Sequence, residues 1–391
     1  MTDAPSFLGF RRPDGRVGVR NHVLVVPTVI CASVVAERIA AAIAPVGAAL
    51  PHLAGCGQLG PDLRVTHDTL AAYCRHPNVG AVLVVALGCE QVVAQYLADA
   101  ARRAGKPSAI VAIQTEGGTI RATERGVTVA RTMAADLASV ARERCDASSL
   151  VLSVKCGGSD YTSGLSSNPV LGRAADRLVD LGGSVVIGEI AEIMGAEHLL
   201  AERARTPDIA ARLINVVSRV ESEAMLLGLD IRGTQPSPGN IRGGLTTIEE
   251  KSLGATHKAG ERAALEDVVD YAAPILKKGL TVMDTPGLDV ESVTGMVGGG
   301  AQVVVFTTGL GTPTGNPIAP VIKITGNART AKSMADNIDL DVSGVIADAE
   351  PLASAADRVF AEILAVCSGS TTAAERLGHR EFAIHRRNPT I

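Results

Sequence analysis

Three segments of the sequence combine glycine-rich turns with side chains that can do chemistry. They are residues 155–160 (KCGGSD), 195–198 (GAEH) and 238–247 (PGNIRGGLTT). The first follows an apolar run, residues 150–154, that is typical of a buried strand, and it places a lysine, a thiol, a hydroxyl and a carboxylate on the turn that leaves the strand. Because ligands of α/β proteins bind at such turns, this segment predicts a functional site.

Two further groups of side chains are suited to proton transfer. Glu197 and His198 are adjacent, which suits either an acid–base pair or a pair of metal ligands. Lys251 directly follows two glutamates. A glutamate near the start of a helix is, however, ordinarily a favourable contact with the helix dipole, and residues 246–249 also resemble a helix cap. The local sequence therefore leaves catalytic and purely structural interpretations open.

Cysteines in the first half of the chain suggest a metal centre. Cys56 and Cys89 lie in glycine turns that follow predicted strands. With Cys156 from the second half, three thiols would be enough for an iron–sulfur cluster or a soft metal ion. No C-x-x-C spacing supports a cluster, and cysteine is also common as a small buried residue. A cluster therefore remains the less favoured alternative.

Polar residues in two other places are candidates for substrate binding. Arg20, Asn21 and His22 begin the first buried strand, and an arginine there would pair bidentately with a carboxylate. Strand starts ordinarily lie away from the ligand edge, so this prediction depends on a cleft made with a second unit. In residues 238–247, Asn240 and Thr246 stand beside glycines that permit close approach of backbone to a ligand.

The composition restricts the protein class. A chain of 391 residues exceeds one ordinary core, which predicts two domains. Only 2% of the residues are aromatic, so the core is built from Val, Ile, Leu and Ala, as in buried parallel sheets. The net charge of 37 − 41 = −4 offers no basic surface for nucleic acid or an anionic membrane. No apolar run approaches the roughly 20 residues of a membrane span. Seven scattered cysteines indicate a reduced, cytoplasmic setting.

Strands and helices alternate in the first part of the chain. A hairpin over residues 7–29 is followed by predicted strands at 79–87 and 108–114 and by predicted helices at 32–44, 63–74, 92–103 and 120–144. This alternation predicts a parallel sheet with helices on its faces. We therefore expect an α/β protein with two domains, each with a mainly parallel sheet flanked by helices, and an active site in the cleft between them.

The predicted domains are residues 1–145 and 146–391. The second has predicted strands at 150–154, 184–188, 280–284, 302–308 and 321–325. Its predicted helices are at 169–181, 330–337 and 355–368, with further helix after residues 192–198 that runs to about residue 227. Residues 230–262 are rich in Gly, Pro, Ser and Thr with little periodicity, which predicts a long active-site loop. The chain lacks G-x-x-x-x-G-K-[ST] and G-x-S-x-G motifs, which disfavours P-loop nucleotide chemistry and serine hydrolysis.

Long motifs across nearly the whole chain resemble the large portion of the altronate/galactarate dehydratase family. They comprise residues 10–22 (FRRPDGRVGVRNH), 155–160, 195–200 (GAEHLL), 239–247, 250–254 (EKSLG), 284–287 (DTPG) and 315–323 (GNPIAPVIK). This family also contains the large subunit of (2R)-sulfolactate sulfo-lyase. Residues 339–344 (DLDVSG) and 378–382 (GHREF) are similar to that branch.

The resemblance implies a metal-dependent lyase that eliminates water from a sugar acid, or a related 2,3-dihydroxy carboxylate, to give a 2-oxo acid. The alternatives are a sulfo-lyase that releases sulfite from a sulfonated 2-hydroxy acid such as sulfolactate, and a non-catalytic ligand-binding subunit. The resemblance further implies a divalent metal, with Fe²⁺ expected first and Mn²⁺ or Mg²⁺ as alternatives. Full-length family dehydratases have an additional small N-terminal domain, so a separate small subunit is an expected partner, as is a homo-oligomer.

The chemistry that the resemblance implies assigns roles to the candidate residues. A base removes the C2 proton, a metal stabilises the enediolate, and the group on C3 departs. We predict proton transfer by Glu197 and His198, with Lys251 stabilising charge. Predicted metal ligands are Cys156 and Asp160, then Cys56 and Cys89. Predicted substrate-binding residues are Arg20, Asn21, His22, Asn240, Thr246, Asn316 and Lys323.

Overall fold

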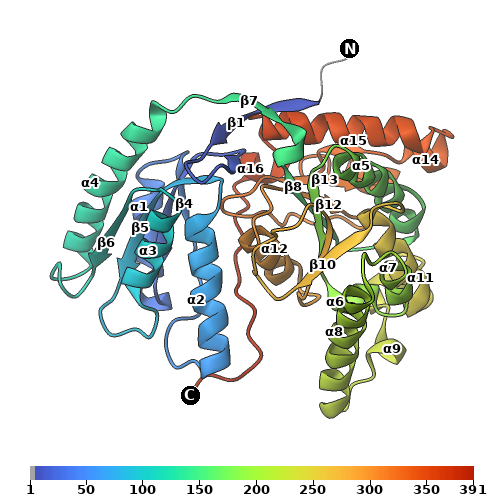
Figure 1. Ribbon diagram of the computed structural model, residues 1–391, viewed down its shortest axis with the longest axis horizontal. Coiled ribbons are helices and arrows are strands. Elements are labelled where there is room, and N and C mark those ends of the chain that lie inside the picture. Colours follow the sequence, from blue (N-terminus) through green and yellow to red (C-terminus); the bar gives the residue numbers. More distant parts are fainter. Residues whose placement is uncertain (1–4) are drawn as a thin grey trace.

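The computed structural model describes residues 5–391, so residues 1–4 of the predicted first domain lie outside the described part. Two α/β units lie side by side, each with a parallel sheet flanked by helices (Figure 1). This arrangement confirms the predicted α/β class with parallel sheets flanked by helices.

The N-terminal unit has a four-stranded parallel sheet in the order β4-β3-β5-β6. Its strands are β3 (His22–Pro27), β4 (Gly47–Ala49), β5 (Val79–Ala86) and β6 (Ser108–Ala112). The apolar run of β5 is buried along its whole length, as expected for a central strand covered on both faces. One face packs against α1 (Ser33–Ala41) and α4 (Thr119–Ala138), and the other against α2 (Gly60–Arg75) and α3 (Ala94–Arg103).

The C-terminal unit has a seven-stranded parallel sheet in the order β10-β11-β9-β8-β12-β13-β14. The strands are β8 (Val151–Cys156), β9 (Ser184–Ile187), β10 (Leu265–Val269), β11 (Gly279–Met283), β12 (Val303–Thr307), β13 (Val321–Thr325) and β14 (Leu340–Asp341). The chain first adds strands on one side of β8 and later on the other. The switch point therefore lies between β8 and β12, where ligands of open α/β sheets bind.

The helices of the C-terminal unit include many short ones. They are α5 (Asn168–Asp180), α6 (Ile190–Ile193), α7 (Glu197–Ala201), α8 (Pro207–Leu226), α9 (Ile231–Thr234), α10 (Pro238–Arg242), α11 (Ile248–Thr256), α12 (Asp289–Gly298), α13 (Ala328–Ser333), α14 (Gly344–Ala347), α15 (Leu352–Cys367) and α16 (Ala373–Leu377). Residues 230–262 thus form short helices rather than one continuous loop. The reason is capping, because Asp230, Ser237 and Thr247 accept hydrogen bonds from the first turns of α9, α10 and α11.

The two units share one packed core. Leu70 and Tyr73 of α2 join Val297 of α12 and Phe306 of β12 in a single buried apolar cluster. The surfaces between the units are therefore in close contact over this region. The chain from Phe382 onward runs between α2 and α12 (Figure 1), where Asp62 accepts hydrogen bonds from the backbone of residues 387 and 388.

A small antiparallel sheet lies above both units (Figure 1) and is formed by β1 (Ser6–Arg11), β2 (Val17–Gly18) and β7 (Glu143–Asp146). The predicted helix at 120–144 was wrong at its end, because α4 stops at Ala138. Cys145 then pairs with Phe7 across β7 and β1, and both side chains enter the core of the C-terminal unit. Burial of these two side chains favours a strand. Among residues 5–391, no helix is long and apolar enough to cross a membrane.

Candidate active site

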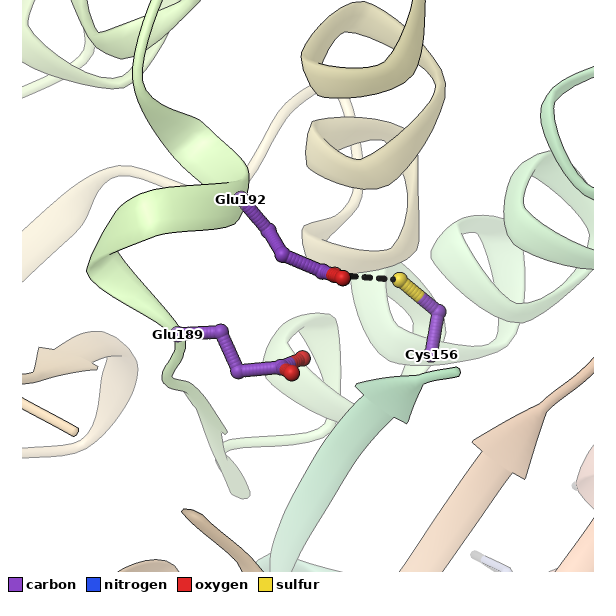
Figure 2. Close-up of side chains that lie close together, drawn as sticks. All are labelled: Cys156, Glu189 and Glu192. Atoms are coloured by element: carbon purple, nitrogen blue, oxygen red, sulfur yellow. Dashed lines mark hydrogen bonds between the residues drawn. The ribbon is translucent and has the colours of Figure 1, made fainter. Parts of the chain in front are cut away.

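A buried thiol and two buried carboxylates meet at the carboxyl edge of the seven-stranded sheet. Cys156 ends β8, Glu189 follows β9, and Glu192 lies in α6 (Figure 2). One potential ligand atom from each residue lies within 4.8 Å of the other two, and no other group of three such residues occurs within residues 5–391. We call these three residues the Cys–Glu–Glu group.

The sheet topology positions this group. β8 and β9 are parallel neighbours, so their carboxyl ends bring Cys156 and Glu189 to one edge, beside the switch point. Glu189 has a left-handed backbone with φ +65°, which is strained for a residue with a side chain. Its N–H donates to Thr285 Oγ1 at 2.7 Å, which holds the turn. A Cβ on Gly188 would lie 2.3 Å from the same oxygen, so the turn requires glycine.

Three lysines alternate with the acidic groups. Lys258 Nζ lies 3.0 Å from Cys156 Sγ and 3.8 Å from Glu192 Oε2. Lys155 Nζ donates to Glu189 and lies 2.6 Å from Asp289 Oδ1. Lys155 and Lys258 are fully buried, so these contacts are charge-assisted and shielded from water.

The third lysine, Lys251, lies at the outer side of the group. Its Nζ is 3.5 Å from Glu192 Oε1 and donates to Gln235 Oε1 at 3.1 Å. It also lines a cavity of about 220 Å³, whose other walls include Ser159, Tyr161 and His257. Lys251 therefore connects the Cys–Glu–Glu group to a space that can hold a small molecule.

Burial and neighbouring charges shift the proton affinities of the group in different directions. Burial, reinforced by Glu192, raises the pKa of the Cys156 thiol to about 12, and the thiol donates to Glu192 Oε2 at 2.9 Å. Burial and the Glu192 carboxylate also raise the pKa of Glu189. For Glu192, burial is outweighed by the ammonium groups of Lys251, Lys155 and Lys258, which lower its pKa. Two adjacent carboxyl groups with opposite shifts are typical of acid–base or metal chemistry.

The group also fits a divalent metal ion. Glu189 Oε2 is buried and has no hydrogen-bond partner within residues 5–391, which is costly unless something else binds it. A thiolate and two carboxylates supply three anionic ligand atoms, a set compatible with Fe²⁺ and other first-row ions. Loss of the thiol proton would be part of binding, since the thiolate is the ligand form.

Among the predicted metal ligands, Cys156 belongs to the Cys–Glu–Glu group, Asp160 lines the neighbouring cavity of about 220 Å³, and Cys56 and Cys89 lie in the N-terminal unit. Asp160 is buried, but its Oδ1 accepts from the backbone of Thr162 and Ser163, and its Oδ2 accepts from Asn327 Nδ2 at 2.7 Å. Cys56 and Cys89 are exposed in the N-terminal unit and do not join Cys156 in a ligand group within residues 5–391.

The predicted proton-transfer pair lies on α7. Glu197 is half-buried, accepts from the backbone N–H of Gly195, and pairs with Arg232 at 3.2 Å. His198 is exposed. Of the three predicted catalytic residues, Glu197, His198 and Lys251, Lys251 is the one that contacts the Cys–Glu–Glu group.

Four predicted substrate-binding residues line a different cavity, of about 350 Å³, between the two units. All five guanidinium N–H groups of Arg20 are used inside the chain, by Glu375 and by three backbone carbonyls. Asn21 accepts from Arg12, and burial lowers the pKa of His22 to about 4. Asn316 Nδ2 donates to Tyr73 Oη and its Oδ1 accepts from the backbone N–H groups of the next turn. These contacts join the two units.

The remaining predicted substrate-binding residues have different surroundings. Asn240 is buried and donates to the backbone carbonyl of Ser159 at 2.9 Å, which holds α10 against the 155–160 turn. Thr246 is exposed and contacts Glu250. Lys323 is fully buried, and its Nζ has no partner within residues 5–391.

Sequence reasoning missed Glu189, Glu192, Lys258 and Asp289. A signal for the two glutamates was present in the sequence. They lie three positions apart directly after the buried strand 184–188, and this spacing brings both side chains to the end of that strand. Nothing in the local sequence distinguishes Lys258 from a surface lysine, since its burial depends on long-range packing.

Two family models match the chain. Residues 9–138 match the second domain of D-galactarate dehydratase/altronate hydrolase, and residues 147–390 match the C-terminal domain of D-galactarate/altronate dehydratase. The (2R)-sulfolactate sulfo-lyase subunit beta of Chromohalobacter salexigens is 40% identical over 386 residues, which cover 97% of each chain.

Dehydratases match over nearly the whole chain as well. The altronate dehydratase of Bacillus subtilis is 34% identical over 99% of this chain and 78% of its own length. The galactarate dehydratase (L-threo-forming) of Escherichia coli is 32% identical over 98% of this chain and 77% of its own length. Dehydratases and sulfo-lyases are both lyases, and the chain is an enzyme of that class. It belongs to the D-galactarate/altronate dehydratase family.

Proposed function

We propose that this enzyme is a metal-dependent lyase that eliminates water from C3 of a sugar acid, giving a 2-oxo acid. The observation that carries the proposal is the Cys–Glu–Glu group, interleaved with three lysines and placed beside a cavity at the switch point of the sheet. Enolisation of a carboxylate substrate builds up negative charge, and a buried site with fixed positive groups stabilises that charge.

Cys156, Glu189 and Glu192 would hold the divalent ion, with Fe²⁺ the first ion to test and Mn²⁺ and Mg²⁺ the alternatives. A bound ion supplies Lewis-acid stabilisation of the enediolate. Lys251 reaches both the cavity and Glu192, so it is placed to bind the substrate carboxylate and to balance the developing charge. Lys155 and Lys258 act as positioning residues that keep the acidic side chains in place. Glu197 and His198 remain the predicted proton-transfer pair.

A second candidate function differs in the leaving group. The sulfo-lyase subunit beta matches over 97% of both chains at 40% identity, which favours release of sulfite from a sulfonated 2-hydroxy acid such as sulfolactate. Both reactions begin with loss of the C2 proton and end in a 2-oxo acid. Because that relative is called a subunit, we also propose a separate small partner subunit, together with a homo-oligomer in the cytoplasm.

The test uses the full chain, purified without oxygen and supplied in turn with Fe²⁺, Mn²⁺ or Mg²⁺. Altronate, galactarate and sulfolactate are each assayed for a 2-oxo acid and for sulfite, with and without the small subunit of a sulfo-lyase. A 2-oxo acid without sulfite supports dehydration, and equal amounts of both support the sulfo-lyase. Light scattering measures the oligomeric state in the same preparations.

Variants then test the site. Cys156→Ser and Glu192→Gln should lower kcat by about 10²-fold or more and weaken binding of the activating metal, whereas the exposed Glu202→Gln should not. Glu197→Gln and His198→Asn, made singly, should abolish turnover if they transfer the proton. Near-normal turnover and metal content in both Cys156→Ser and Glu192→Gln would refute the proposed site.

A further inference from the structure

The seven cysteines divide into two sets with different surroundings. Four are buried, as is usual for this residue type. The other three, Cys31, Cys56 and Cys89, are exposed, and all three belong to the N-terminal unit. They follow β3, β4 and β5, three adjacent strands of one parallel sheet, so they lie along the same carboxyl edge. Exposure of an unpaired thiol is uncommon, and three at one edge call for a common explanation.

Hydrogen bonds hold the three cysteine-bearing loops together. The N–H of Ile30, next to Cys31, donates to the carbonyl of Ala54 at 3.1 Å. The carbonyl of Gly55, next to Cys56, accepts from the N–H of Gln91 at 3.0 Å. These backbone contacts connect each loop with another directly.

A side-chain hydrogen bond connects the remaining pair of loops, those of Cys31 and Cys89. Thr28 Oγ1, in the Cys31 loop, donates to Glu90 Oε1 at 2.6 Å, and Glu90 is the neighbour of Cys89. Each loop is therefore bonded to the other two at a residue within three positions of its cysteine. The three exposed cysteines therefore lie on one connected set of loops.

The backbone next to Cys89 has a conformation that requires glycine. Gly88 precedes Cys89 with φ +125°, and a Cβ there would lie 2.4 Å from Gln114 Oε1, so only glycine permits this turn. Cys31 and Cys89 also flank the switch point of the N-terminal sheet, which lies between β3 and β5. Ligands of open α/β sheets bind at such points.

A cavity of about 510 Å³ adjoins these loops. Ile30, Ala54 and Gln58 form one wall, and Glu291 of α12 belongs to the opposite wall. The same helix begins with Asp289, which contacts Lys155 of the candidate active site. The loops that bear Cys31 and Cys56 thus line a space between the two units.

We propose that Cys31, Cys56 and Cys89 together bind an iron–sulfur cluster at the carboxyl edge of the N-terminal sheet. This centre is separate from the Cys–Glu–Glu group and does not depend on the reaction proposed for it. Three thiolates are the ligands that iron–sulfur clusters and other soft metals select. The fourth ligand of the cluster then comes from outside this set of thiols.

A single tetrahedral ion fits the three thiols less well than a cluster does. One tetrahedral ion with metal–sulfur bonds of about 2.3 Å holds its thiolates within about 4 Å of one another. The sulfur atoms of the three exposed thiols do not all lie within 4.8 Å of one another, so they do not form such a compact group. A cluster places several iron and sulfide atoms between its thiolates and therefore spans a wider set.

The test measures cluster content and does not rely on turnover. The full chain is purified without oxygen, reconstituted with ferrous iron and sulfide, and analysed for iron, acid-labile sulfide and sulfide-to-iron charge-transfer absorption. Cys31→Ser, Cys56→Ser and Cys89→Ser should each lose the sulfide and the absorption. Cys156→Ser and Cys367→Ser, which change cysteines of the C-terminal unit, should retain both.

A second measurement needs no variant, so a folding defect cannot imitate its result. Alkylation of the wild-type protein, mapped by mass spectrometry, should modify all three exposed cysteines before reconstitution and spare all three afterwards. Absence of sulfide after reconstitution, or zinc or iron bound without sulfide, would overturn the proposal. So would sulfide that survives all three replacements or that is lost on Cys156→Ser, because the latter result would place the cluster in the C-terminal unit.

Discussion

Replacement of Lys323 by methionine should make the protein more stable at neutral pH. The Lys323 side chain is fully buried in β13, and its ammonium nitrogen has no hydrogen-bond partner within residues 5–391. Burial lowers the pKa of this amine to about 8, although Asp339 and Glu381 act in the opposite direction. Methionine has a similar length and carries no charge, so it removes the cost of burying an unpaired ammonium group.

The size and sign of the effect follow from this shift. The pKa falls from 10.5 in the unfolded chain to about 8 in the folded protein. At about 1.4 kcal/mol per unit, the charged amine costs about 3 kcal/mol at pH 7. Between pH 8 and 10.5 the folded protein has lost this proton while the unfolded chain still binds it. Stability of the wild-type protein should therefore rise with pH through this window, and the difference from the variant should fall to about 1.5 kcal/mol at pH 9.5.

The assay is urea unfolding of the wild-type protein and Lys323→Met at pH 7 and pH 9.5. Lys332→Met, which changes an exposed lysine of α13, is the matched control and should show neither the stabilisation nor its decrease with pH. A Lys323→Met variant that is less stable than wild type at pH 7 would refute the reasoning. So would a stabilisation of the same size at both pH values, because it would have a cause other than the buried charge.

Three other replacements test features of the site and the fold. Gly188→Ala should lower kcat by about 10-fold or more, because the added Cβ would clash with Thr285 and displace Glu189. The control Gly287→Ala should retain activity in the same assay, because its added Cβ has its nearest neighbour at 4.0 Å. Arg20→Met should lower the free energy of unfolding, measured with urea, by about 2–4 kcal/mol and leave KM unchanged, because the guanidinium binds Glu375 and backbone carbonyls. A raised KM with unchanged stability would contradict this. Asn78→Ala should lower the free energy of unfolding by about 2–4 kcal/mol, because Asn78 Nδ2 donates to the carbonyls of Gln302 and Ile318 across the boundary between the units. Two separate unfolding transitions of the wild-type protein would argue against a shared core.

Sequence patterns predicted the secondary structure best in elements with a regular apolar pattern. The apolar run at 79–87 corresponds to β5 (Val79–Ala86), and the predicted helix at 169–181 corresponds to α5 (Asn168–Asp180). In each, local composition and tertiary environment favour the same structure. The prediction failed for residues 230–262, where the polar residues that suggested a loop are helix caps.

The site was predictable only in part, for a physical reason. Cys156 stood out because it lies on the turn after a buried strand, and the topology then placed that turn at the switch point. Lys258 reaches Cys156 from 102 residues along the chain, and a single sequence carries no periodic pattern for such a contact. For Arg20 the sequence could not show that the guanidinium pairs with Glu375 of its own chain, because that partner lies 355 residues away.

The charges around the Cys–Glu–Glu group explain why metal and substrate should bind together. Glu192 and Asp289 face Lys155, Lys251 and Lys258, and the raised pKa of Glu189 favours its neutral form, so the site has one excess positive charge when the thiol also keeps its proton. A divalent ion adds two positive charges in a low-dielectric region, where an unbalanced charge is costly. Loss of the protons of Cys156 and Glu189 would offset these two charges, and the carboxylate of a bound hydroxy acid would offset the remaining positive charge. With the proposed ion bound, an anionic substrate would therefore balance the charge of the site, which agrees with the proposed action on hydroxy acids.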